Sequence, residues 1–400
     1  MTLVSIDKNK LLPKQAVHDW TSNPRVRGLV TQIVAVLAVV LFVLLIGYNA
    51  ATNLQERNIA SGFGFLLRPA GFDISFSMIS YRPTDTYGRV IVIGLLNTLL
   101  IACLGCFLAT LLGFLLGILR LSSNVLAATA VYWYTELARN IPLLLQIIFW
   151  WVALSFSLPP ISRAIDLGFG AHLSKKGIHL PAPTTTPGLL PFALALFTAV
   201  AVSIFMIRWS ARKQERTGKR RPVIGFCALA LVALPAAAIT TLGTPVVWDI
   251  PVIGRFNASG GVTLQPELVA LLLGLVIYTS AFIAEIVRSG IQSVGRGQRE
   301  AATALGLRFA PIMRLIIIPQ AMRVIVPQLT LQYLNLLKNS SLGVAIGYPE
   351  LMSLVAGSVN NQTGQAIETI AITMAIYLSI SLCTAAFMNW YNQRVAMVER

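Results

Sequence analysis

The sequence predicts an all-α polytopic membrane protein with about eight transmembrane helices, and two observations predict it. First, the chain is apolar: 56% of its 400 residues are hydrophobic, only 12% are charged, and the mean hydropathy is +0.73. A soluble domain carries about a quarter charged residues, so this composition excludes a soluble enzyme and a disordered chain. Second, the net charge of +16 comes from basic residues that lie between long apolar runs rather than along a basic stripe. That arrangement is typical of cytoplasmic loops and argues against a nucleic-acid partner.

Seven apolar runs reach or approach the length of about 20 residues that a spanning helix needs. They are Leu29 to Tyr48, Val90 to Ile118, Ile141 to Ser157, Leu189 to Ile207, Val223 to Leu242, Leu264 to Val287 and Ile367 to Met388. An eighth, less regular run from Val324 to Leu337 contains Pro327 and meets Lys338 at its end. Eight spans would place both termini on the same side of the membrane.

The basic residues indicate which side this is. With the N-terminus inside, the expected cytoplasmic segments hold 22 of the 31 Lys and Arg residues and the outside segments hold 9. This bias follows the positive-inside rule and predicts that both termini are cytoplasmic. Residues Met1 to Gly28 lack a short apolar run ending in a cleavage site, so we expect a tail rather than a secretory signal. The basic run Arg212 to Arg221 is the strongest anchor, and we interpret it as a topology determinant rather than a lipid or nucleic-acid site.

Two features interrupt the plain succession of spans. Residues 158–188 hold five prolines and are expected to form an outside loop without a long helix. The two spans that follow return the chain to the side it left, as an inserted hairpin would. The stretch Val125 to Arg139 mixes aromatic and charged residues, which predicts an interfacial helix that leads into the next span.

The loop after the sixth span carries the most informative pattern. Residues Glu300 to Leu305 form a predicted short helix with small residues on one side, and Gly306 is expected to end it. Glu300 lies near the start of this helix, where a carboxylate favours the helix dipole. A polar, small-faced helix between two spans indicates a docking surface for a cytoplasmic partner. An ordinary loop helix is the alternative.

The spacing in this loop resembles the signature of ABC importer permeases. That signature reads E-A-A, three residues, G, nine residues, I, one residue, an apolar residue and P, and here it consists of Glu300-Ala301-Ala302, Gly306, Ile316, Ile318 and Pro319. Ile318 stands where leucine is usual. The flanking segments are similar to the polar-amino-acid branch of the family: Tyr134 to Leu144, Ala284 to Ile291, Pro319 to Arg323 and Leu337 to Leu342. Asn140 and Ile141 depart from that branch, where glycine and threonine are common.

The resemblance covers residues 90–157 and 264–390, and it implies a division of the chain. It implies the five-helix core of a type I ABC importer permease, with an extra N-terminal helix and an inserted two-helix hairpin. Residues 1–89 would hold the cytoplasmic tail, first helix and periplasmic loop, residues 158–263 the insertion, and residues 391–400 the cytoplasmic tail. This plan is similar to the larger subunits of general L-amino-acid importers of the Aap/Bzt type in the bacterial inner membrane.

The resemblance also implies a mechanism and partners. Two permeases would form the pore, two copies of an ATPase would lie beneath them, and a periplasmic binding protein would deliver the amino acid. The inserted hairpin favours a heterodimer with a homologous permease over two copies of this chain. The coupling helix from Gln298 to Gly306 would dock in the ATPase through Gln298, Glu300, Ala301, Ala302, Leu305 and Gly306. ATP and Mg would bind the partner, because this chain has no G-x-x-x-x-G-K-[ST] phosphate cradle and therefore no expected cofactor or catalytic residue of its own.

Charges within spans are costly and are therefore functional candidates. Glu285 and Arg288 are three residues apart on one helix face, and Glu136 and Arg139 have the same spacing. Each pair is interpreted either as a local ion pair or as part of a cross-helix network that closes an inner gate.

A second group of candidates surrounds Lys338, about 22 Å along a helix from Arg323. With its neighbours it could bind an amino-acid carboxylate at a broken helix, or Lys338 could extend to the outer interface. The members of this group are Asn335, Lys338, Asn339, Ser340 and Ser341. Tyr278 and Thr279, in mid-span, are expected to serve helix packing more than substrate binding. The three histidines are scattered outside the spans, so no metal site is expected.

Two other protein classes compete with a permease. A proton- or sodium-driven secondary transporter would need an acid deep in a span, but Glu285 lies near a cytoplasmic end. An intramembrane enzyme would need a Ser/His pair, paired aspartates or an H-E-x-x-H motif within the spans, and the sequence has none.

Overall fold

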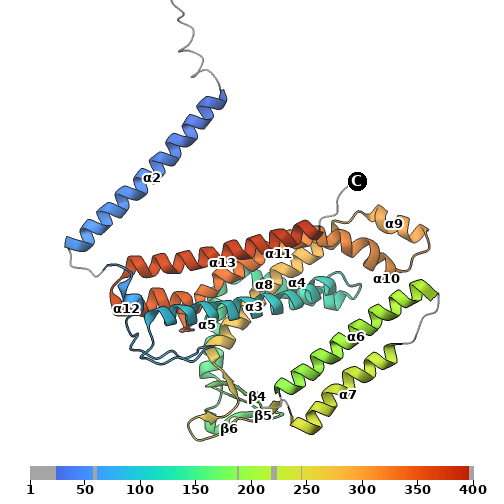
Figure 1. The fold of residues 1–400 in the computed structure, drawn as a ribbon. Coiled ribbons are helices and arrows are strands. Elements are labelled where there is room, and N and C mark those ends of the chain that lie inside the picture. The colour runs from blue at the N-terminus through green and yellow to red at the C-terminus, as the bar shows by residue number, and fades with distance from the viewer. Residues whose placement is uncertain (1–23, 57–60, 187–188, 218–222, 245, 396–400) are drawn as a thin grey trace, which may run out of the picture.

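The computed structural model describes residues 24–56, 61–186, 189–217, 223–244 and 246–395. The predicted N-terminal tail and the end of the basic run Arg212 to Arg221 therefore lie largely outside the described residues. The fold is a helical bundle with a group of small sheets at one end and two outlying helical segments (Figure 1).

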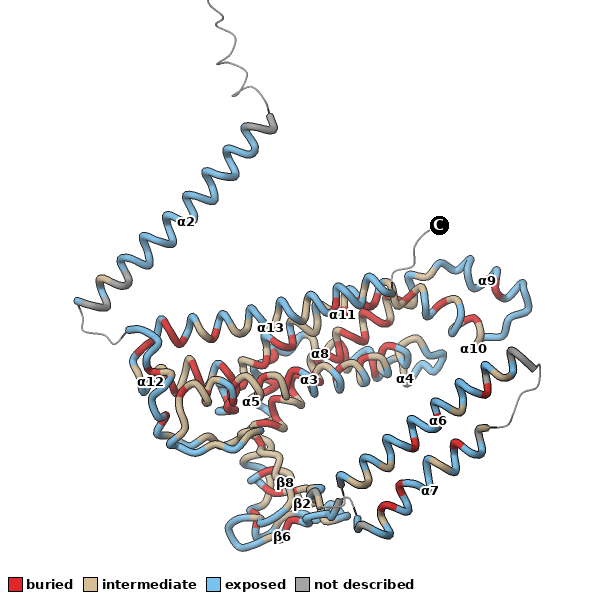
Figure 2. Tube along the Cα trace, in the orientation of Figure 1, coloured by how far each residue is buried: buried red, intermediate tan, exposed pale blue. Residues whose placement is uncertain are grey.

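The bundle is built around α8 (Pro266–Gln292), which is the most buried of the candidate spans. Its neighbours are α3 (Tyr87–Leu119), α5 (Leu143–Phe156) and α11 (Ile318–Asn339), and Figure 2 shows the buried residues gathered where these helices meet. Glycines allow the close approach. A Cβ atom on Gly113 of α3 would lie 2.6 Å from Ile283 of α8, and one on Gly290 of α8 would lie 2.4 Å from Ile325 of α11. Small residues at helix contacts are the usual packing device within a bilayer.

The helix α4 (Val125–Asn140) meets α5 at a bend of 102°. Pro142 starts α5, and its ring prevents the residue before it from continuing a helix. The side-chain amide of Gln146 donates to the carbonyl oxygens of Ala138 (2.8 Å) and Ile141 (3.0 Å), which satisfies two groups near the break. The predicted helix over Val125 to Arg139 is therefore present and leads into the next span through this bend.

The C-terminal part of the bundle is irregular. α10 (Phe309–Ile312) and a π turn (Met313–Ile317) lead into α11, so this span starts before the predicted Val324. After α11 come a 3-10 helix (Ser340–Ile346), a π-helical segment (Met352–Val359) and α12 (Asn360–Thr363). The long helix α13 (Ala366–Val395) closes the bundle along α11.

Two helical segments lie away from the bundle. α2 (Pro24–Glu56) is exposed at nearly every described position, as its pale trace in Figure 2 shows. The segment after it is tied to the bundle where Gly62 donates its N–H to the Glu368 carboxylate at 2.5 Å. α6 (Leu189–Thr217) and α7 (Ile224–Leu242) pack along each other through small buried residues such as Ala199 and Ala238.

The bundle is helical as expected, and the described residues of the loops around this hairpin hold eight short strands. They are β1 (Ile165–Gly168), β2 (Ala171–Ser174), β3 (Gly177–Leu180), β4 (Ala182–Thr185), β5 (Val246–Asp249), β6 (Val252–Ile253), β7 (Ala258–Ser259) and β8 (Val262–Leu264). They form an antiparallel sheet in the order β1-β2-β3-β8 and two ribbons, β4-β5 and β6-β7. Strands of two to four residues show no alternation long enough to detect in a sequence.

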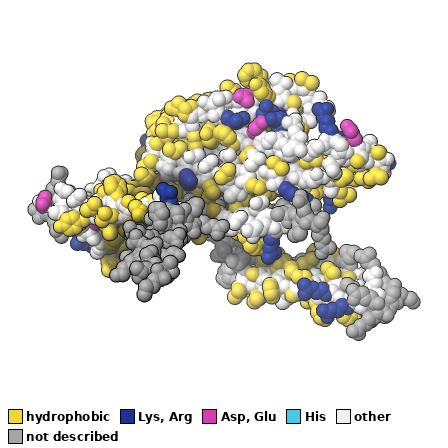
Figure 3. Space-filling model, turned by 90° about the horizontal axis from the view of Figure 1, so that it is seen from above, with side chains coloured by type: hydrophobic (Ala, Val, Ile, Leu, Met, Phe, Trp, Pro, Cys, Tyr) yellow, Lys and Arg dark blue, Asp and Glu magenta, His cyan; other side chains and the backbone are white. Residues whose placement is uncertain are grey.

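Among the described residues, six helices are long and apolar enough to cross a membrane, and α4 with α5 would make a seventh. The remaining predicted span, Val223 to Leu242, corresponds to α7, which is a shorter apolar helix over Gly225–Thr241. Hydrophobic side chains cover much of the bundle surface in Figure 3, as a lipid-facing surface requires.

Candidate functional site

The loop that carries the E-A-A pattern forms α9 (Arg296–Ala304), a helix that projects at one end of the bundle (Figure 1). Gly306 has a φ of +75°, a conformation that favours glycine. The N–H groups of Gly306 and Leu307 donate to the carbonyl oxygens of Thr303 (2.9 Å) and Ala302 (3.2 Å) and close the helix end. The predicted coupling helix runs from Gln298 to Gly306, whereas α9 starts two residues earlier, at Arg296, and ends two residues earlier, at Ala304. Gly306 lies in the turn that follows the helix.

The two faces of α9 differ. Ala302 is only 2% exposed and packs in a small apolar cluster with Ile312 and Ile317. Gln298, Glu300 and Ala301 are exposed. Leu305, just past the helix, is 81% exposed. Ala302 was expected to dock against a partner, but it faces the protein instead and anchors the helix. An exposed leucine beside an anchored polar helix leaves a surface that a partner could cover.

In the last two turns of α8, the Glu285 carboxylate pairs with arginines from α8 and from the end of α3. The carboxylate accepts from Nη1 of Arg120, at the end of α3, at 3.0 Å and from Nε of Arg288 at 3.1 Å. Arg120 also donates to the hydroxyl of Thr135 on α4 at 2.9 Å. The Arg120 and Glu285 side chains are 14% and 28% exposed. Glu285 and Arg288 therefore form a local ion pair that Arg120 extends across helices.

Glu136 and Arg139 behave differently despite the same spacing, and they form no ion pair in the part of the chain that the structure describes. The guanidinium of Arg139 lies 5.1 Å from the ring centre of Phe282 on α8. The Glu136 carboxylate instead accepts from Asn140 at 3.3 Å. The expected local pair is thus wrong here, because Arg139 reaches across to α8 rather than along its own helix.

The mid-span residues of α8 make contacts within their own helix and with α4. Thr279 is buried, and the ring of Tyr278 lies 4.9 Å from that of Phe282, one turn further along α8. Beside them, the Tyr134 hydroxyl lies 2.9 Å from the Ser280 hydroxyl. These contacts are of the helix-packing kind.

At the other end of the bundle, α11 stops at Asn339, so the predicted break beside Lys338 exists. The hydroxyls of Ser340 and Ser341 donate to the carbonyl oxygens of Leu337 (2.6 Å) and Lys338 (2.7 Å) and so satisfy the helix end. Ser340 is fully buried. Asn335 and Lys338 are exposed, Asn339 is partly so, and among the described residues Lys338 forms no ion pair.

Comparison with known proteins shows which protein family the chain belongs to. The family described as "Binding-protein-dependent transport system inner membrane component" matches residues 208–397. The "Putative amino-acid ABC transporter permease protein YhdX" of Escherichia coli (strain K12) is 49% identical over 379 residues, which cover 95% of this chain and 96% of that protein. The chain belongs to the family of amino-acid ABC transporter permeases. The family is the membrane-spanning part of importers that also use an ATPase and a binding protein, and it belongs to the bacterial inner membrane.

Two further relatives of the permease are similar over nearly the whole chain. AapQ, a general L-amino acid transport system permease protein of Rhizobium johnstonii, is 44% identical over 94% of each chain. BztB, a glutamate/glutamine/aspartate/asparagine transport system permease protein of Rhodobacter capsulatus, is 40% identical over 94% of this chain and 96% of its own. A crystal structure of an amino acid ABC transporter with histidines aligns at 21% identity and a TM-score of 0.46, covering 77% of this chain and 95% of that one. Family membership decides against a secondary transporter, because this family is the transport subunit of ABC importers and not itself the ATPase.

Sequence reasoning missed one polar cluster of the permease, centred on Glu350. This carboxylate is fully buried and accepts hydrogen bonds from the N–H groups of Met352 and Ser353 (both 2.7 Å) and from the hydroxyl of Tyr377 on α13 (2.9 Å). Nearby, the Asn97 amide of α3 donates to the carbonyl of Pro349 at 2.8 Å. The cluster thus fastens the irregular segment after α11 to α3 and α13. An acid within the apolar run Gly347 to Val355 was the signal that could have found it.

Proposed function

We propose that this permease forms one half of the transmembrane pathway of an ATP-driven importer for polar and general L-amino acids. The single observation that carries the proposal is α9, a helix anchored by Ala302 whose remaining surface is exposed. ATP hydrolysis belongs to a separate ATPase, so the chain acts as a transport subunit without catalytic activity of its own.

The outer surface of α9 is the proposed docking site. Glu300, Ala301 and Leu305 would lie against a groove of the ATPase, with Gln298 and Gly306 at its edges. Movement of the ATPase would shift α9 and, through the short link Ser293 to Gly295, the end of α8. The charges on Arg120, Glu285 and Arg288 lie at that end of α8, which supports a role for them in closing the inner gate.

Both termini are proposed to lie in the cytoplasm. The C-terminal end of α13 points toward the same end of the bundle as α9 in Figure 1, away from the sheets. The basic residues Arg212, which is exposed, and Lys213, which is partly exposed, follow the apolar part of α6. Positive charge at this end supports a cytoplasmic placement, and the sheets would then lie in the periplasm.

The substrate class rests on the relatives. AapQ is named for general L-amino acids and BztB for glutamate, glutamine, aspartate and asparagine. The partners proposed are a homologous second permease, two copies of the ATPase and a periplasmic amino-acid-binding protein. The α6–α7 hairpin favours a heterodimer, because two such appendages would otherwise have to fit around one pore.

Two experiments test the proposal. The tagged chain is purified from its native membrane and every bound subunit is identified. A soluble ATPase and a second, different permease are expected, and a chain that purifies alone would contradict the proposal.

The complex is then placed in vesicles loaded with ATP on the ATPase side, and uptake of labelled glutamate, glutamine and a neutral amino acid is followed with Ala301→Asp as the docking variant. An unpaired charge at a covered surface costs several kcal/mol, so ATPase binding should be lost.

A further inference from the structure

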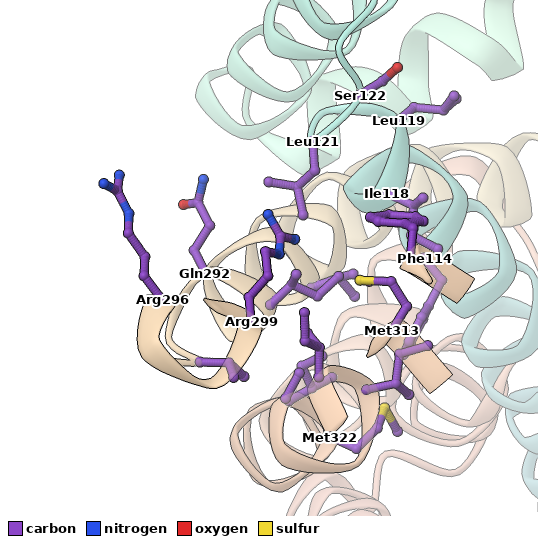
Figure 4. Close-up of a pocket in the computed structure, with 18 of the residues that line it drawn as sticks. Phe114, Ile118, Leu119, Leu121, Ser122, Gln292, Arg296, Arg299, Met313 and Met322 are labelled. Atoms are coloured by element: carbon purple, nitrogen blue, oxygen red, sulfur yellow. The ribbon is translucent and has the colours of Figure 1, made fainter. Parts of the chain in front are cut away.

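A cavity of about 1230 Å³ lies between the end of α3, the ends of α8 and α11, and α9 (Figure 4). Its wall is mainly apolar and includes Phe114 and Ile118 of α3, Met313 of the π turn and Met322 of α11. These side chains face one another across the space in the close-up. Unbranched methionine side chains suit a flexible apolar occupant, because they adjust their shape readily.

The mouth of the cavity is basic. Arg296 and Arg299 belong to its lining, and Figure 4 shows Arg299 reaching from α9 toward Leu121. Neither arginine forms an ion pair among the residues that the structure describes. Gln292, also at the mouth, receives a hydrogen bond from Arg288 and is thus held by the Glu285 network. Two uncompensated guanidinium groups above an apolar cavity are complementary to a molecule with an anionic head and an apolar tail.

The surroundings indicate where such a molecule comes from. The walls are formed by α3, α8 and α11, which cross the membrane, and Leu115, Ile118 and Ile318 beside the cavity are between 45% and 57% exposed. Apolar side chains exposed on crossing helices face acyl chains. Basic pockets between spanning helices on the cytoplasmic side are suited to anionic lipid head groups.

We propose that this cavity binds one anionic phospholipid from the leaflet on the α9 side. An acyl chain lies among Phe114, Met313 and Met322, and the phosphate lies between Arg296 and Arg299. The lipid would connect the turn after α3 with the coupling helix. Anionic lipid would then hold α9 in the position from which it acts on α8.

The test measures lipid binding directly and needs no transport, so its failure is distinct from failure of the proposed function. The full-length chain is extracted from the membrane and purified in detergent with all subunits that bind it. The lipids that it retains are then identified by mass spectrometry. Arg296→Gln and Arg299→Gln are compared with Arg314→Gln, a control at an exposed arginine outside the cavity lining. Met322→Trp fills the apolar part with both arginines present, and Met322→Leu is its conservative control.

Phosphatidylglycerol or cardiolipin should be enriched in the wild-type protein above their share of the membrane. Retention should fall about fivefold for each arginine removed, since a basic residue near an anionic surface contributes about that factor. Arg314→Gln and Met322→Leu should retain the lipid, and Met322→Trp should lose it. Equal loss in Arg314→Gln, retention in proportion to membrane composition, or cross-linking of a partner peptide into the cavity would each overturn the proposal.

Discussion

Arg120 at the end of α3 and Glu285 of α8 are 165 positions apart, yet Nη1 and Oε2 lie 3.0 Å from each other. Because Glu285 also binds Arg288, one carboxylate compensates two guanidinium groups. The side chains are partly shielded from water, so these contacts exceed the small value of fully exposed ion pairs.

Replacing Glu285 by Gln should therefore leave two cations without their partner. We expect a loss of about 1–2 kcal/mol in stability, which is less than for a fully buried pair because Glu285 is partly exposed. Thermal unfolding of the purified complex measures this loss. Glu136→Gln is the matched control, since among the described residues its carboxylate belongs to no ion pair, and an equal shift in the two variants would contradict the assignment.

Adjacent alanines of α9 should respond in opposite ways to the same change. Ala302→Leu forces extra volume into the cluster with Ile312 and Ile317 and should destabilise the loop by about 1–3 kcal/mol. Ala301→Leu changes only an exposed surface, so the chain should fold normally while ATPase binding weakens. Proteolytic sensitivity of the loop and co-purification of the ATPase report the two effects separately. Reversal of the two patterns would show that the faces of α9 are wrongly assigned.

The contact between Gly113 and Ile283 should tolerate no added methyl group. A Cβ at Gly113 would lie 2.6 Å from side-chain atoms of Ile283, so Gly113→Ala should cost about 1–3 kcal/mol. Gly47→Ala on α2 meets nothing within 4 Å and should be neutral or slightly stabilising. The unfolding temperatures of the two variants measure this difference, and equal temperatures would contradict the close contact between Gly113 and Ile283.

The four-stranded sheet should loosen in acid. Its buried His179 bonds to the hydroxyls of Ser174 (3.1 Å) and Thr263 (2.9 Å). Burial lowers the pKa of His179 below its ordinary value of 6.5, and the charges of His172 and Lys176 lower it further. The folded sheet favours neutral His179, so this stability is complete above pH 6.5 and is lost as the pH falls through the depressed pKa.

Hydrogen exchange of residues 165–185 between pH 7.5 and 5 follows this change. His179→Gln should flatten the pH dependence of protection in the sheet. His18→Gln, in the tail, should leave it intact. An unchanged profile in His179→Gln would assign the acid response to another group.

The sequence alone was sufficient to predict the features that depend on a local pattern of residues. Hydropathy located the spans, and the E-A-A spacing located α9 to within two residues. Contacts between distant segments could not be predicted in this way. The pairing of Arg120 with Glu285 depends on how α3 packs on α8, and the inward position of Ala302 depends on the π turn that follows. Glu350 was missed because it lies between the predicted spans, in an apolar run too short to cross a membrane.

The chain runs without interruption from β8 through α8 to α9. At 1.5 Å per residue, the 27 residues of α8 form a rod about 40 Å long. Close glycine contacts with α3 and α11 restrain this rod against bending. A protein bound at the sheets and a protein bound at α9 would therefore act on the two ends of one stiff body. Thermodynamic linkage then makes their effects reciprocal: whatever binding at the sheets does to the affinity of α9, binding at α9 does equally to the affinity of the sheets.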